Sequence, residues 1–595
     1  MFTTHKNKDG SQITERLFST AMVAFIASNL STAIGPVVDG IIVGTCYSVD
    51  DIAAIGLTSF LLVGYRTVAA SIIAKGAHVI ASSRIGAGDK EAANRVFSLS
   101  VILSLFSAVV LALLSIVFSE QLAVFVGARK GLARLVTPAS DYLRGYCVGL
   151  PFFAATTVLT PFLQMDGDYN RVTFSSVVMT ITDILADLFV VKALHGGLFQ
   201  IGLATSVGHL ASFLVVISHF IFKKSIFRFK PRRIRWSESR DILANGMSTG
   251  VVKLSHTFSG ILINQMLAVS FSAEVIAAFG VGNQIFKFCF SLWLGAASTL
   301  MSFSSMFFGE EDKKALQDVQ MVALRKGLVL TCSAAAAIFL FAGPLSGVFL
   351  RNANSAAKGM AAESIRFLAL SMPLNVFIYC FQQYLIGVGR KLFSCVYSFI
   401  LDFAIPVPMT FLLLTALGYR GAWIAKPVIN IAVILAAVFY ILRQRGTGFR
   451  EKMLLLPENF GAETEHELFM EVDSMFDVTG VSRIAIAFIL ENGFSKHDAN
   501  IVSLAIEEMA GNIVQHGFTD GMPHLVQIRI LAKDGELILR LRDDCRTFDP
   551  VDRYRTQLQF EPDPEKGIAI KMMMRLVREI KYTGLYGMNN LIIRI

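Results

Sequence analysis

Charged residues are scarce in this sequence of 595 residues: Asp, Glu, Lys and Arg make up 17% of it, and hydrophobic residues 54%. An ordinary soluble domain carries about 25% charged residues, so a wholly water-soluble fold is not expected. Cysteine is also rare, with seven residues and no Cys-x-x-Cys pair, which argues against a disulfide framework and a zinc site. The motif Gly-x-x-x-x-Gly-Lys-Ser/Thr is absent, which excludes a P-loop nucleotidase.

The few charges are unevenly distributed. Residues 1–450 hold 38 Lys and Arg against 22 Asp and Glu, a net charge of +16, whereas residues 451–595 hold 16 against 23, a net charge of −7. The basic residues lie in short loops between apolar runs, which favours a role in membrane orientation and argues against nucleic-acid binding. The chain therefore divides into a membrane part and a C-terminal soluble part.

Long apolar runs predict an all-α polytopic bundle of twelve transmembrane helices, because about 20 apolar residues cross a bilayer as one closed helix. Residues 1–16 are a polar tail, and the apolar run from Leu17 is too long for a signal-peptide core, so it is predicted to be a retained first helix. The predicted spans are 17–45, 52–82, 96–126, 140–165, 170–193, 198–222, 242–271, 274–308, 324–350, 362–388, 392–416 and 421–442.

Lys and Arg gather in alternate loops, and this asymmetry predicts the orientation of the bundle. The basic loops include Arg84 to Arg95, the linker 223–241 and Arg443 to Arg450. If these loops face the cytoplasm, both termini do so too, since the number of spans is even. The predicted location is the plasma membrane, with many passes and the C-terminal part in the cytoplasm.

Three landmarks recur at an offset of about 220 residues, which indicates an internal duplication. An offset of six spans keeps the two halves in the same orientation, around an axis along the membrane normal, with a cavity between them suited to alternating access. The predicted repeats are 17–222 and 242–445. The paired landmarks are Asp51-Ile-Ala-Ala-Ile-Gly56 with Val275-Ile-Ala-Ala-Phe-Gly280, Gly86-Ala-Gly-Asp-Lys90 with Gly309-Glu-Glu-Asp-Lys313, and Pro151-Phe with Pro373-Leu.

These motifs, together with Gly35-Pro-Val-Val-Asp-Gly-Ile-Ile-Val-Gly44 and Leu163-Gln-Met-Asp-Gly-Asp168, resemble the multidrug and toxic compound extrusion (MATE) family. The resemblance covers residues 12–445. It implies a secondary antiporter that exports small organic compounds, often cationic or aromatic, in exchange for Na⁺ or H⁺.

Ionisable groups inside the spans are candidates for ion coupling, since each costs about 2.5–3.5 kcal/mol to insert. Asp39 follows Pro36, whose missing N–H loosens the helix and frees carbonyl groups that can join a carboxylate around Na⁺. The family resemblance also places a cation-sensitive acidic residue in this first span. A buried, permanently paired Asp39 is the alternative.

Other polar residues in the spans are candidates for transport. Asp183 and Asp187 are spaced i, i+4, so they share one helix face and repel unless a cation or proton lies between them. Lys253, His256 and Asp402 are candidate partners of these two carboxylates across the cavity. Asn264 and Gln265 are further candidates, as neutral hydrogen-bond donors in the cavity. A role in helix packing is the alternative. The basic residues Arg66, Lys75 and Lys287 also lie within spans and would disfavour a cationic cargo if they faced the cavity. The sequence therefore does not predict the charge of the cargo.

About 145 residues remain, enough for one domain, predicted over 459–595 after a linker at 446–458. Asp534-Gly535 between two alternating segments is a strong hairpin signal. The predicted helices are 464–478, 482–493, 497–515 and 567–579, and the predicted strands are 524–532, 537–543, 579–583 and 589–595.

The chemistry of this domain lies in Glu508 and Asn512, i and i+4 on one helix, in Asp543 at a strand end, and in Gly567 at the start of a helix. Together they resemble the GHKL (histidine kinase-like) ATPase fold, an α/β sandwich, and its anti-sigma-factor serine kinase branch. The resemblance implies Glu508 as general base, Asn512 as the Mg²⁺ ligand, Asp543 as the adenine-binding residue and Gly567 in the phosphate lid. In place of Asp-x-Gly-x-Gly the chain has Asp543-Asp-Cys-Arg-Thr547, which departs from the family pattern.

Three hypotheses follow. The first is an ion-coupled exporter with a cytoplasmic ATP-binding regulatory domain. The second is a transporter-like receptor that controls a serine/threonine kinase acting on a protein similar to an anti-sigma-factor antagonist. The third is an inert C-terminal scaffold that binds no Mg-ATP.

Overall fold

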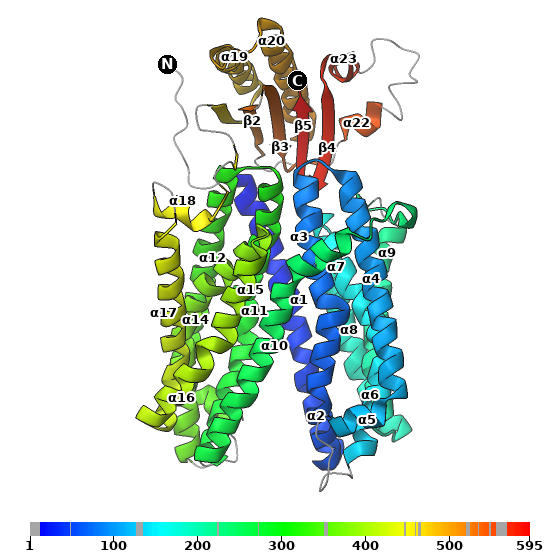
Figure 1. Ribbon diagram of the computed structural model, residues 1–595, viewed down its shortest axis with the longest axis vertical. Coiled ribbons are helices and arrows are strands. Elements are labelled where there is room, and N and C mark those ends of the chain that lie inside the picture. The colour runs from blue at the N-terminus through cyan, green and yellow to red at the C-terminus, as the bar shows by residue number, and fades with distance from the viewer. Residues whose placement is uncertain are drawn as a thin grey trace.

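A long helical bundle forms most of the molecule, and a smaller α/β domain sits on one of its ends (Figure 1). We call this end of the bundle the domain end and the opposite end the far end. The computed structural model describes residues 12–47, 49–125, 135–222, 225–271, 273–349, 355–444, 448–457, 460–461, 466–518, 524–533, 535–546, 549–554 and 568–595.

The first half of the bundle has six helical segments in the described residues, several of them bent or interrupted. They are α1 (Gln12–Cys46); α2 (Val49–Arg66), joined to α3 (Ile72–Gly86) by the π-helical turn η1 (Thr67–Ser71); α4 (Lys90–Val117) with α5 (Ser119–Phe125); α6 (Val136–Val148) with α7 (Leu150–Met165); α8 (Tyr169–Phe189) with the π-helical turn η3 (Val190–Leu194); and α9 (Leu198–Phe222).

The second half repeats this arrangement after a linker that contains the short 3-10 helix η4 (Pro231–Arg233). Its segments are α10 (Glu238–Ser270); α11 (Ala273–Gly309); α12 (Lys313–Leu340) with α13 (Ala342–Phe349); α14 (Ser355–Gly387); α15 (Lys391–Phe399), continued by the π-helical turn η5 (Ile400–Ala404) into α16 (Pro406–Leu417); and α17 (Tyr419–Leu442). Each of the twelve predicted spans corresponds to one segment. The short helix α18 (Phe449–Leu454) leads out of the bundle.

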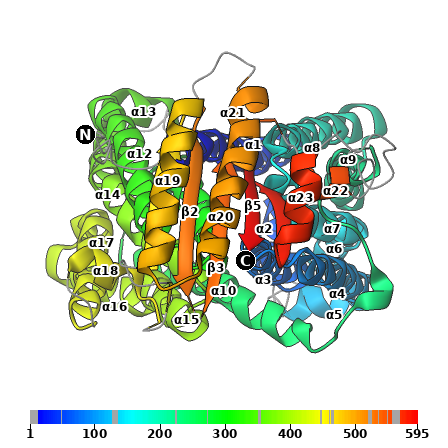
Figure 2. The same ribbon diagram turned by 90° about the horizontal axis from the view of Figure 1, so that it is seen from above.

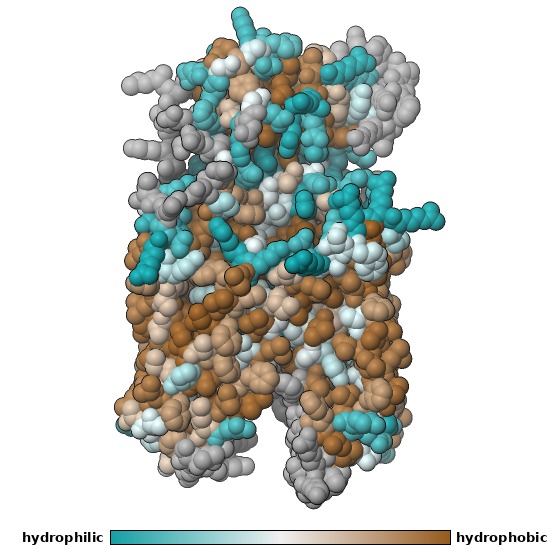
Figure 3. All heavy atoms as spheres, in the orientation of Figure 1, coloured by the Kyte–Doolittle hydropathy of each residue, from teal (hydrophilic) through white to brown (hydrophobic). Residues whose placement is uncertain are grey.

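The face of the bundle seen in Figure 3 is largely apolar between its two ends, as expected for a protein embedded in lipid. Large apolar side chains are exposed on its helices, among them Phe106 of α4, Leu340 of α12 and Leu412 of α16. Among the described helices, seven are long and apolar enough to cross a membrane, or eight if the bent pair α6 and α7, which meet at 46°, counts as one span.

Equivalent turns in the two halves have the same backbone geometry, as the duplication predicts. Asp89 caps α4 and Asp312 caps α12, and each carboxylate accepts a hydrogen bond at 2.9 Å from the N–H three residues later. The residue before each cap is left-handed, with φ +82° at Gly88 and +54° at Glu311. Glu311 adopts there a conformation that side chains rarely take.

The two halves touch backbone to backbone at the domain end. A Cβ atom on Gly309 of α11 would lie 1.9 Å from the carbonyl oxygen of Ser83 in α3, and one on Gly86 would lie 2.2 Å from the carbonyl oxygen of Met306. Only glycine permits helices to approach so closely. Toward the far end the halves separate and a hollow opens between them (Figure 3). The bundle is therefore closed at the domain end and open at the far end.

The C-terminal domain is an antiparallel sheet of five strands in the order β1-β2-β3-β5-β4, with helices on one face (Figures 1 and 2). Its apolar core includes Val481, Ile506, Leu539 and Ile593 between helices and sheet. The strands are β1 (Glu467–Val472), β2 (Val526–Lys533), β3 (Glu536–Asp543), β4 (Glu579–Leu585) and β5 (Met588–Arg594), and the helices are α19 (Met475–Glu491), α20 (Lys496–Ala505), the π-helical turn η7 (Ile506–Ala510), α21 (Gly511–Gly517), α22 (Pro550–Arg553) and α23 (Ile568–Leu576).

The predicted helix at 464–478 is wrong, because its first half forms the edge strand β1. Glu467–Val472 pairs with β2 from Glu467↔Leu531 to Val472↔Val526. Leu, Met and Glu favour helix locally, but pairing with a neighbouring strand outweighs this weak preference. The helix predicted from residue 482 begins earlier, at Met475, because the hydroxyl of Ser474 accepts a hydrogen bond from the N–H of Asp477.

Candidate functional site

The first candidate site lies in the first half of the bundle, where Asp183 and Asp187 of α8 are both buried. Gly208 of α9 makes room for Asp183, since a Cβ atom there would lie 3.2 Å from the Asp183 Cβ. Among the described residues, Arg66, Thr205 and Tyr146 are polar groups that interact with Asp183. The carboxylate therefore has a basic partner on α2 and a hydroxyl partner on α9.

Arg66 is held in place by aromatic rings. Its Nε donates a hydrogen bond to the phenol oxygen of Tyr146, and its guanidinium carbon lies 5.0 Å from the ring centroid of Tyr146 and 5.3 Å from that of Phe153. Aromatic faces attract a cation, and this attraction strengthens where water is excluded. Asp183 therefore sits beside a fixed positive charge.

Asp187 has different surroundings, one helical turn nearer the far end. It interacts with Tyr47, whose hydroxyl donates a hydrogen bond of 2.8 Å to the carbonyl oxygen of Gly196. The two carboxylates share one helix face, as their spacing predicts, but each interacts with its own set of neighbours.

In the second half, Asp402 lies buried in the π-helical turn η5, and its Oδ2 has no hydrogen-bond partner among the described residues. Its basic neighbour is Lys426 of α17, whose Nζ lies 4.8 Å from the ring centroid of Phe286. Lys253, a predicted partner of Asp183 and Asp187, donates a hydrogen bond of 2.6 Å to Ser71 in the first half. π-Helical turns are frequent at functional sites.

Of the predicted transport residues, Asp39 in α1 and Asn264 in α10 have side chains that lie outside the described residues. Gln265 is exposed on α10. The role of Asp39 in ion coupling therefore stays a prediction.

The second candidate site lies in the C-terminal domain, between α21 and the end of β3. Glu508 lies in the π-helical turn η7 and Asn512 in α21, and both are half-buried. Asp543 ends β3, and its Oδ1 accepts hydrogen bonds from Asn589 Nδ2 at 2.7 Å and from the N–H of Cys545 at 2.9 Å. Burial raises the pKa of Asp543, although these hydrogen bonds oppose the rise.

These groups fit part of the nucleotide site that the sequence predicts. Asp543 offers a buried, fixed carboxylate suited to an amino group, and Asn512 an amide suited to Mg²⁺. Cys545, which stands where the resembled family has glycine, packs on the end of α21, 3.1 Å from where a Cβ atom on Gly517 would lie. Gly567, the predicted phosphate-lid residue, lies outside the described residues.

A cluster that the sequence did not reveal joins this site to the bundle. His524 Nδ1 lies 2.7 Å from Asp544 Oδ1, and Arg16 of α1 forms an ion pair with Asp544 and lies 3.2 Å from His524 Nδ1. Ligand atoms of His524, Asp544 and Cys545 lie within 4.8 Å of one another. More than 500 residues separate Arg16 from its partners, so no local pattern in the sequence indicates the contact.

Two helical halves around a hollow, with buried carboxylates and a domain end closed by glycine contacts, define a two-repeat membrane transporter that carries an ATPase-type domain. The MatE family model matches residues 24–189 and 249–412, and the chain belongs to that family. The model of the histidine kinase-like ATPase domain matches residues 475–595. The predicted resemblances to the MATE family and to the histidine kinase-like ATPase fold are thereby confirmed, and the two matched ranges agree with the predicted duplication. The anti-sigma-factor serine kinase branch stays a prediction.

Relatives in both sequence and structure agree with this assignment. The chain is 24% identical over 396 residues to the probable multidrug resistance protein NorM of Thermotoga maritima, which covers 64% of this chain and 82% of the relative. It is 22% identical over 381 residues to the multidrug export protein MepA of Staphylococcus saprophyticus, covering 63% and 82%. A solved outward-facing multidrug resistance MATE family transporter has a TM-score of 0.67 at 21% identity, covering 72% of this chain and 96% of that one.

Proposed function

We propose that this protein is an antiporter that exports small organic compounds in exchange for Na⁺ or H⁺, with its domain end in the cytoplasm. The observation that carries the proposal is the pair of buried carboxylates, Asp183 and Asp187, on one face of α8 in a bundle whose halves separate toward the far end. A buried carboxylate inside a membrane is costly, and binding a cation or proton relieves that cost. Ion occupancy is thereby linked to the conformation of the bundle.

The proposed orientation rests on the basic residues near the domain end. Lys90, Lys313 and Lys391 each lie at the start of a helix there, and the linker with η4 adds Arg232 and Arg233. Lys and Arg are retained on the cytoplasmic side during insertion. The relatives named multidrug resistance and multidrug export proteins support a small organic cargo.

Transport in proteoliposomes tests the proposal. A fluorescent organic substrate should leave against its gradient when a Na⁺ or H⁺ gradient is imposed, and Asp183→Asn should abolish this coupling. Asp141→Asn is the matched control, because Asp141 is a partly exposed residue of α6 paired with Arg144. Coupled transport that survives in Asp183→Asn and Asp187→Asn alike would contradict the assignment.

We also propose that the C-terminal domain binds ATP and Mg²⁺, with Asp543 and Asn512 as the binding residues. When bound, ATP would supply an adenine amino group for Asp543 and phosphates for Mg²⁺. Calorimetry of the full-length protein with Mg-ATP should show heat that is lost in Asp543→Ala. Asn492→Ala, at the end of α19, is the control. Equal heats of Mg-ATP binding in the two variants would show that Asp543 is not part of the nucleotide site.

A further inference from the structure

The sheet of the C-terminal domain has two faces with different contacts. Helices α19 to α21 cover one face, and the other rests on the domain end of the bundle (Figures 1 and 2). Successive residues of a strand point to opposite faces, so Arg542 points to the bundle if its neighbour Asp543 points to the helices. Asn589 and Asn590, their register partners on β5, alternate in the same way.

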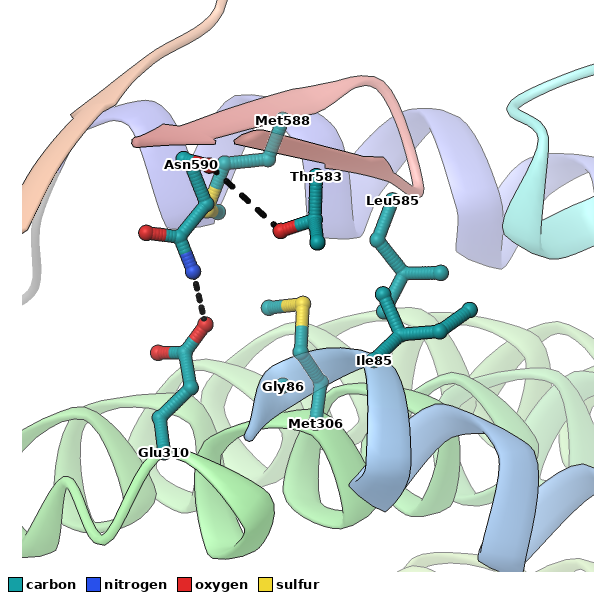
Figure 4. Close-up of a pocket in the computed structure, with 8 residues that line it drawn as sticks. All are labelled: Ile85, Gly86, Met306, Glu310, Thr583, Leu585, Met588 and Asn590. Atoms are coloured by element: carbon teal, nitrogen blue, oxygen red, sulfur yellow. Dashed lines mark hydrogen bonds between the residues drawn. The ribbon is translucent and has the colours of Figure 1, made fainter. Parts of the chain in front are cut away.

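The face toward the bundle binds the turn between α11 and α12 through buried ionic contacts. Arg542 pairs with Glu310 and lies 2.8 Å from Asp312, while Asn590 Nδ2 donates a hydrogen bond of 2.7 Å to Glu310 (Figure 4). Arg529 donates to the carbonyl oxygen of Glu311 at 3.1 Å. Burial opposes ionisation of Asp312, but Arg529 and Arg542 hold its pKa well below the usual value. These charges are satisfied only while the domain is docked.

The same sheet also binds the first half of the bundle. Arg540 donates a hydrogen bond of 3.4 Å to the carbonyl oxygen of Gly86, and Lys90 lies 3.6 Å from Asp549. Gly86 is one of the glycines that close the domain end. The sheet therefore contacts both halves where they meet, through Arg540 and Arg542 of β3.

A tyrosine at the tip of the β4–β5 hairpin lies between the two halves. Tyr586 contacts His78 and Ser82 of the first half through its hydroxyl, at 2.8 and 3.2 Å, and its ring stacks on Phe303 of the second half at 5.3 Å. Tyr586 has a φ of +55°, a left-handed conformation that is costly for a bulky residue and persists only where its surroundings enforce it. Figure 4 shows the hairpin residues Leu585 and Met588 facing Ile85 and Met306 across a narrow space.

We propose that the face of this sheet toward the bundle is a lock that keeps the domain end of the transporter closed. Nucleotide binding at Asp543 opens this lock. The inference rests on the proposed function, because it assigns the regulation of the same transporter and the same nucleotide site. An inward-open state requires Glu310 to separate from Gly86, and while the sheet is docked both are tied to it.

The direction of the effect follows from the loop after β3. Cys545 packs on Gly517, and Asp544 holds Arg16 of α1, so residues 544–545 connect the end of α21 to α1. A nucleotide that enters between Asn512 and Asp543 displaces this loop and with it the ion pair of Asp544. Because Asp543 and Arg542 are adjacent on one strand, the movement also strains the contacts of Arg542 with Glu310.

Hydrogen exchange of the full-length protein in lipid nanodiscs tests the lock. Exchange of segments 76–90 and 302–312 should be about tenfold faster in Arg542→Ala and in Tyr586→Ala, which corresponds to 1.4 kcal/mol. Arg578→Ala is the matched control, since Arg578 is an exposed residue of the same domain, and its ion pair among the described residues is with Glu536 of that domain. Unchanged exchange in both lock variants would overturn the proposal.

Two additions separate the lock from misfolding and from the proposed function. The double variant Arg542→Ala/Glu310→Gln removes both charges of this buried ion pair and keeps the buried charges balanced, so it should fold and still show fast exchange. Addition of Mg-ATP, at concentrations where calorimetry shows saturation, should accelerate exchange in the wild type but not in Asp543→Ala. If ATP binds but exchange stays unchanged or becomes slower, the proposal that the nucleotide opens the lock is overturned. Lack of ATP binding refutes the nucleotide half of both proposals, whereas lack of ion-driven transport refutes only the proposed function.

Discussion

The phenol oxygen of Tyr586 lies 2.8 Å from Nε2 of His78, so a hairpin of the C-terminal domain is hydrogen-bonded to the transporter bundle. Both side chains are buried, and the backbone N–H of Tyr586 also donates to the carbonyl oxygen of Met165 at 2.7 Å. A hydrogen bond between buried groups costs free energy when one partner is removed. The two parts of the chain are therefore expected to affect each other's stability.

Substitution of Tyr586 tests this connection. Tyr586→Phe leaves His78 without this partner, which should cost about 1–3 kcal/mol of stability, and Tyr586→Ala should cost more, about 3–5 kcal/mol, because it also removes the ring from the contact with Phe303. Thermal unfolding in detergent measures the loss. Tyr440→Phe, on a partly exposed residue of α17, is the control and should change little. Equal effects of the two Tyr→Phe changes would contradict the expectation.

A single methyl group at the domain end should disturb its closure. In Gly309→Ala the new Cβ would meet the carbonyl oxygen of Ser83 at 1.9 Å, so α3 and α11 must move apart. We expect faster exchange at 76–90 and weaker coupled transport. Gly280→Ala on the same helix is the control, since nothing lies within 4 Å of its Cβ position. Wild-type exchange in Gly309→Ala would show that the domain end is not closed by this contact.

Nucleotide affinity should depend on pH through Asp543. Burial raises its pKa above the ordinary 3.8, and only the ionised carboxylate keeps all its acceptor capacity for the adenine amino group. Lowering the pH through the raised pKa protonates Asp543, so ATP affinity should begin to fall at a pH above 3.8. Calorimetric titrations with ATP at several pH values measure this fall in affinity, which we call the pH step. The Asp543→Asn variant cannot ionise there, and if it showed the same pH step, the step would belong to another group.

The charge of the cargo should reflect the basic side chains in the middle of the bundle. Lys253 interacts electrostatically with Arg66 and Lys75, and it reaches across the two halves to Ser71. Such a cluster attracts anions. We expect Lys253→Gln to reduce export of an anionic dye more than that of a cationic dye in proteoliposomes. Lys192→Gln, an exposed residue of η3, is the control. A larger loss for the cationic dye would reverse the assignment.

Local patterns predicted most of the fold because lipid imposes strong rules. Runs of about 20 apolar residues must form helices, so each predicted span has its counterpart, and the recurring glycines and aspartates marked equivalent turns. Asp183 and Asp187 share a helix face for the same reason, their i, i+4 spacing. The error at 464–478 arose where no such rule applies, since the partner strand β2 lies more than 50 residues away.

The amino-acid sequence by itself determined that the chain spans a membrane as two repeats and ends in an ATPase-type domain, because hydropathy, repetition and short motifs are local properties. Only the tertiary structure decided that Arg542 meets Glu310, that Tyr586 lies between the halves and that Arg16 reaches Asp544. These contacts join residues more than 200 positions apart, and their partners are chosen by how the sheet packs on the bundle. No spacing along the chain encodes that packing.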